Sequence, residues 1–70
     1  MKADEIRALA DDKIRAQIDE TREELMNLRF QQSTGELLDT SRIRVTRHLL
    51  ARLKTILHER EQEAAVEGES

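Results

Sequence analysis

The feature that most constrains the fold is an apolar stripe in residues 41–58, whose members recur every three or four positions. At 100° per residue these side chains share one side of a helix, within an arc of about 80°. They are Ile43, Thr46, Leu50, Leu53 and Leu57, with Leu49 and Ile56 widening the stripe on one side. Alternating steps of three and four form the seam along which two helices pack. This segment therefore predicts a helix that needs a second helix beside it.

A matching stripe lies earlier in the chain, in residues 12–33, and its members again alternate in steps of three and four. They are Ile14, Ile18, Thr21, Leu25 and Leu28. We expect Asp11 and Asp12 to cap the start of this helix, and Gly35 to end it as the C′ residue. Asp39 is the best candidate to cap the next helix, with Thr40 and Ser41 as rivals. Because the connecting loop is short, the two helices are predicted to run antiparallel.

The two ends of the chain are predicted to differ. Residues 2–9 form a short helix whose Ile6 and Leu9 must dock elsewhere, because so short a helix is unstable alone. Leu37 and Leu38 are expected to cover the open end of the helix pair. The sequence thus predicts an all-α fold with one domain over residues 1–62, helices at about 2–9, 12–33 and 40–61, and a flexible acidic tail over residues 63–70.

Composition excludes most kinds of chemistry. The chain has no cysteine and 39 % charged residues, and it carries no Gly-rich phosphate loop or nucleophile motif. Neighbouring carboxylates point apart on a helix, and His48 and His58 lie about 15 Å apart along it. We therefore expect no enzyme, cofactor, metal site or small-molecule substrate. No apolar run is long enough to span a membrane, and we expect a cytoplasmic protein.

Charge is distributed unevenly along a chain of net charge −3. Residues 25–60 carry seven basic and three acidic side chains, whereas residues 1–24 carry five basic and eight acidic ones, and residues 61–70 carry four acidic and no basic ones. Such asymmetry is more informative than the total. The middle of the chain is predicted to meet an anionic partner.

The basic side chains form two rows. Arg44, Arg47, Lys54 and His58 share a second arc of the later helix, with Ala51 inside it, and Arg15, Arg22 and Arg29 recur at seven-residue spacing on the earlier one. Arginine suits phosphate because its planar fork can donate two hydrogen bonds, and long helices can track the backbone of folded RNA. Such rows can equally solvate the outer faces of a helical hairpin, and both interpretations stay open.

Phe30 lies nearly opposite the seam of its helix, one turn after Met26. An exposed apolar pair indicates a partner surface, although single exposed aromatics are common. With Arg29 and Gln31 beside it, Phe30 would combine base stacking with charge and amide hydrogen bonding.

The residues that carry a recognisable pattern are Leu28-Arg29-Phe30-Gln31, Thr34-Gly35-Glu36-Leu37, Ile43-Arg44, Arg47 through Leu53, and Lys54-Thr55. With the opening MKADEIRALADDKI, they make residues 1–60 resemble the bacterial large-subunit ribosomal protein twenty-nine family without a gap. The resemblance implies a short helix followed by two long antiparallel helices. It also implies a position on large-subunit rRNA near the mouth of the peptide exit tunnel.

The resemblance further implies neighbours and site residues. The neighbours would be ribosomal protein twenty-three and nascent-chain factors such as trigger factor and signal recognition particle. The RNA-facing residues would be Arg29, Phe30, Gln31, Arg44, Arg47, Arg52 and Lys54. Family members are usually basic, whereas this chain is acidic in residues 11–24 and in its tail, so we expect the end bearing the termini to face away from RNA. The alternative function is a helical protein–protein adaptor or coiled-coil dimer without RNA binding.

Overall fold

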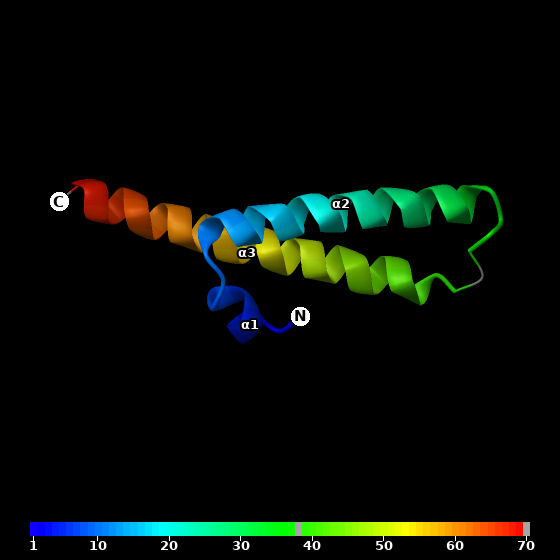
Figure 1. The fold of residues 1–70 in the computed structure, drawn as a ribbon, viewed down its shortest axis with the longest axis horizontal. Helices are drawn as coiled ribbons and strands as arrows, with labels where there is room; N and C mark the ends of the chain where they lie inside the picture. The colour runs from blue at the N-terminus through cyan, green and yellow to red at the C-terminus, as the bar shows by residue number, and fades with distance from the viewer. Residues whose placement is uncertain (38, 70) are drawn as a thin grey trace.

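The computed structural model describes residues 1–37 and 39–69, with side chains as far as Val66 in the last helix. It contains α1 (Ala3–Arg7), α2 (Asp11–Ser33) and α3 (Ser41–Glu69). Helices α2 and α3 run antiparallel, and α1 packs against the side of α3 near the end that bears the termini (Figure 1). The molecule measures 54 × 18 × 15 Å. The predicted all-α architecture of a short helix and a long hairpin is confirmed.

The seam between α2 and α3 is the core of the hairpin. All five predicted positions of α2 are buried, and in α3 Thr46 and Leu53 are buried while Ile43, Leu50 and Leu57 are half-buried. The two buried threonines need hydrogen-bond partners, since an unpaired hydroxyl would cost free energy. Thr21 Oγ1 donates to the carbonyl of Gln17 at 2.6 Å, and Thr46 Oγ1 donates to that of Arg42 at 2.8 Å. Each threonine thus satisfies its hydroxyl within its own helix.

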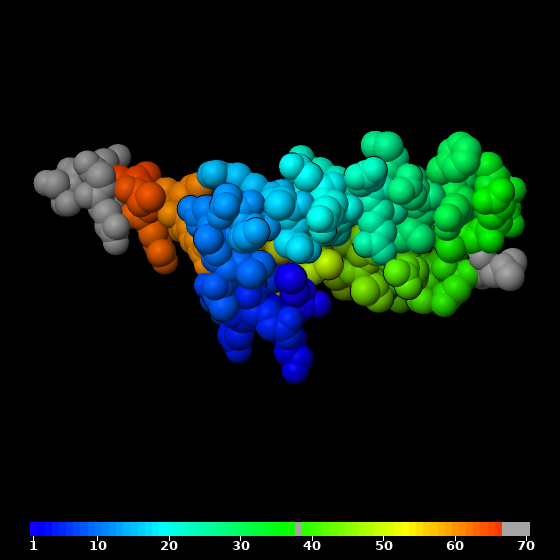
Figure 2. Space-filling view, viewed as in Figure 1, coloured from blue at the N-terminus to red at the C-terminus, as the bar shows by residue number. Residues whose placement is uncertain are grey.

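Helix α1 completes the core at the end bearing the termini. Ile6 is fully buried, in one cluster with Ile14, Ile18, Leu53 and Ile56, and Leu9 packs against that cluster. The predicted docking of Ile6 and Leu9 is confirmed. Figure 2 shows α1 projecting from one side of the hairpin, and the last turns of α3 extending alone beyond the start of α2. Because α1 lies on the Ile56 side of α3, Ile56 is more buried than Leu57.

The start of α2 differs from the prediction. Ala10 occupies the N-cap position, no side chain caps the helix, and Asp11 is its first residue. The predicted cap by Asp11 and Asp12 is wrong because both residues lie inside the first turn of the helix. The Asp11 carboxylate instead accepts a hydrogen bond from Arg60 Nη1 at 2.8 Å. Arg60 also donates to the carbonyls of Arg7 and Leu9, at the end of α1. One side chain of α3 therefore ties α1 and α2 together.

The loop follows the predicted chemistry. Gly35 has φ of +80°, and its N–H donates to Gln32 while that of Glu36 donates to Gln31, which is the Schellman arrangement that ends a helix. Asp39 Oδ1 accepts the N–H of Ser41 at 2.9 Å. Hydrogen bonding by the Ser41 side chain, followed by this bond from its backbone N–H, lowers the pKa of Asp39 below its ordinary value of 3.8. Leu37 is half-buried, and the covering role expected of Leu38 lies outside the described residues.

The last helix is longer than predicted. The sequence predicts an end near residue 61, before an acidic tail over residues 63–70, whereas α3 continues to Glu69. Alanine and glutamate are strong helix formers, so the loss of apolar spacing ends the seam without ending the helix. Residues 61–66 are exposed and add nothing to the core. The flexibility of this segment stays a prediction, and Ser70 lies outside the described residues.

Candidate functional site

The two edges of the seam place different side chains on opposite flanks of the hairpin. On one flank, Arg42, Leu49 and Ile56 follow α3 at seven-residue spacing. Arg42 pairs with Glu24 of α2 at 3.4 Å, and Ile56 shares a cluster with Ile6 of α1. We call this side the α1 flank. The other side, which we call the cationic flank, carries Arg15, Arg22 and Arg29 of α2 and Arg47, Lys54 and Glu61 of α3.

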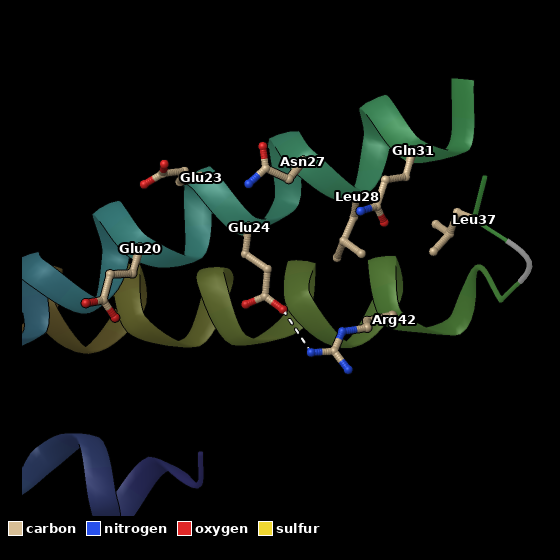
Figure 3. Close-up of a pocket in the computed structure, with 8 residues that line it drawn as sticks. All are labelled: Glu20, Glu23, Glu24, Asn27, Leu28, Gln31, Leu37 and Arg42. Carbon is tan, nitrogen blue, oxygen red and sulfur yellow. Dashed lines mark hydrogen bonds and ion pairs between the residues drawn. The ribbon is translucent and has the colours of Figure 1, made fainter. Parts of the chain in front are cut away.

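A groove on the α1 flank is acidic. Glu20, Glu23 and Glu24 line it together with Asn27, and Leu28 and Leu37 supply apolar surface toward the loop (Figure 3). Its one cation, Arg42, is held by Glu24. Gln31, predicted to face RNA, lines this groove. The structure thus places Gln31 among carboxylates, on a different side of α2 from Arg22 and Arg29.

A groove on the cationic flank has the opposite character. Arg15, Arg22, Lys54 and His58 line it, over apolar surface from Ile18 and Leu57, and Asp19 and Glu61 also reach it. Arg15 Nη2 lies 3.7 Å from Glu61 Oε1. Lys54 and His58 therefore line the same groove as the arginines of α2. Arg44 and Arg47 instead line a separate hollow with His48 and Ala51. The predicted arc of α3 is split between two sites.

Arg52 and Phe30 have contrasting surroundings. Arg52 Nη1 donates to the carbonyl of Met1 at 2.8 Å, so this guanidinium lies at the N-terminal segment. Phe30 is 66 % exposed and Met26 is 71 % exposed, as the position opposite the seam predicts. Arg29 beside Phe30 is exposed as well. The seven predicted residues therefore do not form one surface. Lys54 lines the groove of the cationic flank, Arg44 and Arg47 line a separate hollow, Gln31 lines the acidic groove and Arg52 lies at the N-terminal segment.

Sequence reasoning missed two arginines whose roles depend on tertiary structure. Arg60 had no assigned role, yet it contacts both α1 and α2, and its side chain is only 25 % exposed. The sequence pattern places Arg22 in a row of arginines but does not indicate Lys54 as its neighbour in a groove. The seven-residue spacing in both helices, combined with antiparallel packing, could have indicated the second arrangement.

Two features are absent from the residues that the structure describes. No group of three or more His, Cys, Asp or Glu side chains within them could hold a metal ion. Among the same residues, no helix combines the length and the apolar character needed to cross a membrane.

Comparison with known proteins gives a consistent result. The family described as ribosomal L29 protein matches residues 4–60. Large ribosomal subunit protein uL29 of Roseiflexus sp. (strain RS-1) is 59 % identical over 61 residues, which cover 87 % of this chain and 86 % of that protein. The proteins of the same name from Staphylococcus aureus (strain JH9) and Staphylococcus carnosus (strain TM300) are each 56 % identical over 63 residues, or 90 % of this chain and 91 % of theirs.

Proposed function

The chain belongs to the ribosomal L29 protein family, and from this premise we propose that it binds large-subunit rRNA near the peptide exit tunnel. Membership makes it a structural constituent of the large ribosomal subunit, ribosome-bound in the cytoplasm, and not an enzyme. Its partners are therefore rRNA and other ribosomal proteins. The proposal adds which surface of this chain meets RNA.

The exposed Phe30 carries the proposal. It is the chain's one aromatic residue, and 66 % of its surface is left to solvent although the seam offers apolar surroundings. An aromatic ring in that position can stack on an unpaired base. Arg29 precedes it in α2, and across the loop Arg44 and Arg47 line a hollow together with His48 and Ala51. Stacking and phosphate contacts are thus available near the closed end of the hairpin.

The alternative of a coiled-coil dimer is weakened by the burial of the seam. Ile14, Ile18 and Leu53 are at most 6 % exposed in the single chain, so the stripe that a second chain would use is already covered by the chain itself. Sedimentation of the purified, RNA-free protein tests this directly. We expect a monomer, and a stable dimer at low micromolar concentration would favour the adaptor function.

The neighbours on the ribosome form a second part of the proposal. We infer contact with ribosomal protein twenty-three, and proximity to trigger factor and signal recognition particle, from the resemblance of residues 1–60 to the family. The acidic groove lies on the α1 flank, on a different side of the hairpin from the groove of Arg22 and Lys54. Charge therefore favours RNA on one side of the hairpin and protein or solvent on the other.

Gradient fractionation of cell lysate gives the first test. We expect the protein to sediment with 50S particles and to resist a moderate salt wash. In binding assays with large-subunit rRNA, Arg44→Gln and Arg47→Gln should each weaken binding across RNA sequences and lower the salt slope by about 0.7–0.9. Phe30→Ala should weaken binding by about 1–3 kcal/mol without changing that slope.

The matched control is Arg7→Gln, which removes the same charge from an exposed helical position on α1. It should leave binding close to that of the unaltered protein. If all three site variants bound rRNA as tightly as the control, with unchanged salt slopes, the proposed surface would be wrong.

A further inference from the structure

The cationic flank has a regular register between its two helices. Arg15 of α2 lies opposite Glu61 of α3, with 3.7 Å between Nη2 and Oε1. A step of seven residues along each helix, in opposite directions, brings Arg22 opposite Lys54, and these two residues line the same groove. A further step brings Arg29 opposite Arg47, because heptad spacing on antiparallel helices preserves the pairing. The flank thus has three pairs of facing residues, one from each helix, and we call each pair a rung.

The charges on this flank are not arranged as in a hairpin that is stabilised by ion pairs between its two helices. Such hairpins place opposite charges across the seam, as the α1 flank does with Glu24 and Arg42 at 3.4 Å. On the cationic flank, Arg22 and Lys54 instead line one groove with like charge. The register predicts the same for Arg29 and Arg47, and like charges at such short range are unfavourable for the hairpin itself. Among the described residues, no carboxylate lies within ion-pairing distance of Arg22 or Lys54, and Asp19 shares their groove without pairing to either.

We propose that Arg22 and Lys54 together bind a backbone phosphate of RNA, extending the RNA-binding surface from the closed end along the groove to the middle of the hairpin. This inference rests on the proposed function. A phosphate between two cations from different helices removes their mutual repulsion, and Arg22 can donate two hydrogen bonds to it. The apolar floor of Ile18 and Leu57 keeps the two side chains on the rim of the groove.

The rung formed by Arg15 and Glu61 limits the site. Glu61 neutralises Arg15 at the end near the termini, and both side chains are more than half exposed. The positive potential of the flank therefore falls from the closed end toward the termini. The register predicts that Arg15 becomes available to a phosphate once Glu61 loses its charge.

The test measures binding of the full chain to large-subunit rRNA at several salt concentrations. Arg22→Gln and Lys54→Gln should each weaken binding about five-fold at 0.15 M salt and lower the salt slope by about 0.7–0.9. Arg7→Gln, the control for loss of one positive charge outside the flank, should change neither quantity by a comparable amount. Glutamine preserves helix propensity, and circular dichroism checks that each variant is folded.

Glu61→Gln supplies an effect in the opposite direction, which misfolding cannot imitate. By releasing Arg15, it should strengthen binding by up to about five-fold and raise the salt slope by up to about 0.9. In the Arg15→Gln background the same substitution should have little effect, because the cation that it releases is absent.

The outcomes separate this inference from the function on which it rests. If Arg44→Gln and Arg47→Gln weaken binding while Arg22→Gln and Lys54→Gln do not, the RNA site ends at the closed end and the groove proposal is overturned. Equal losses for Arg22→Gln and Arg7→Gln would also overturn it, since only net charge would then matter. Failure of the unaltered protein to bind rRNA would overturn both proposals.

Discussion

The two ends of the hairpin are built differently. At the end bearing the termini, α1 adds a third helix, and Ile6 and Leu53 are completely buried. At the closed end only two helices meet, Ile43 is half-buried, and Phe30 is largely exposed. A third helix can enclose an apolar side chain that two helices leave partly open.

The difference separates stability from recognition. The Arg60 contacts lie where α1 packs against the hairpin, whereas the exposed aromatic and the hollow of Arg44 and Arg47 lie toward the closed end. Side chains that bind a partner cannot also be covered by the chain's own core. The short helix α1 therefore concentrates the apolar burial at one end and leaves the other available for binding.

Core truncation at the two ends gives the largest expected difference. Leu53→Ala removes a side chain of zero exposure from the cluster closed by α1, and we expect it to cost about 3–5 kcal/mol. Leu28→Ala, toward the closed end, removes the same atoms from a site that borders the acidic groove, and we expect about 2 kcal/mol because such a site can relax. Urea denaturation followed by circular dichroism measures both.

Conservative substitutions keep this comparison measurable if a leucine variant does not fold. Ile56→Val should cost about 1 kcal/mol, and Ile43→Val, at a half-buried position, should cost less. Equal losses at the two ends, in either pair of variants, would contradict the view that α1 concentrates stability.

Loss of the Arg60 contacts should have an intermediate effect. Arg60→Gln removes the donors that reach the carbonyls of Arg7 and Leu9 and the Asp11 carboxylate. We expect a loss of about 1–3 kcal/mol, because the carbonyls at the end of α1 have no following turn to accept from. Hydrogen exchange should show faster exchange of the α1 amides, with little change around Leu28.

Arg60→Lys is the control that keeps the charge. A single ammonium group cannot reproduce a guanidinium fork that spans three acceptors, so this variant should also loosen α1. If it behaved like the unaltered protein, charge alone would hold α1, and the role assigned to the fork would be wrong.

Local spacing was sufficient to predict the helices and their seam. Steps of three and four identify which face of a helix is buried whatever its partner, and Gly35 and Asp39 act through bonds to their immediate neighbours. The end of α3 could not be predicted in this way. The apolar pattern stops at Leu57, but the helix continues on backbone propensity alone.

The candidate site was harder to predict because it depends on the side of α3 to which α1 binds. A helical wheel gives the angular positions of Arg52, Lys54 and Gln31 around their helices. It does not show which side of the hairpin another helix covers. Arg52 reaches the Met1 carbonyl only because α1 docks on that side, and Arg60 acts through residues some fifty positions away. Such contacts leave no trace in the periodicity of either segment.

The smallest expected effect concerns the closed end and depends on pH. Because the bond to Ser41 lowers the pKa of Asp39, the folded state binds the carboxyl proton less readily than the unfolded state. The stabilisation is therefore complete above the ordinary pKa of 3.8, and it is lost as pH falls through the lowered value.

Urea unfolding of the unaltered protein and of Asp39→Asn should show a small difference in the free energy of unfolding that is constant from pH 7 to about pH 5. That difference should shrink in stronger acid. A difference that grew with acid would mean that the Asp39 carboxylate does not stabilise the start of α3.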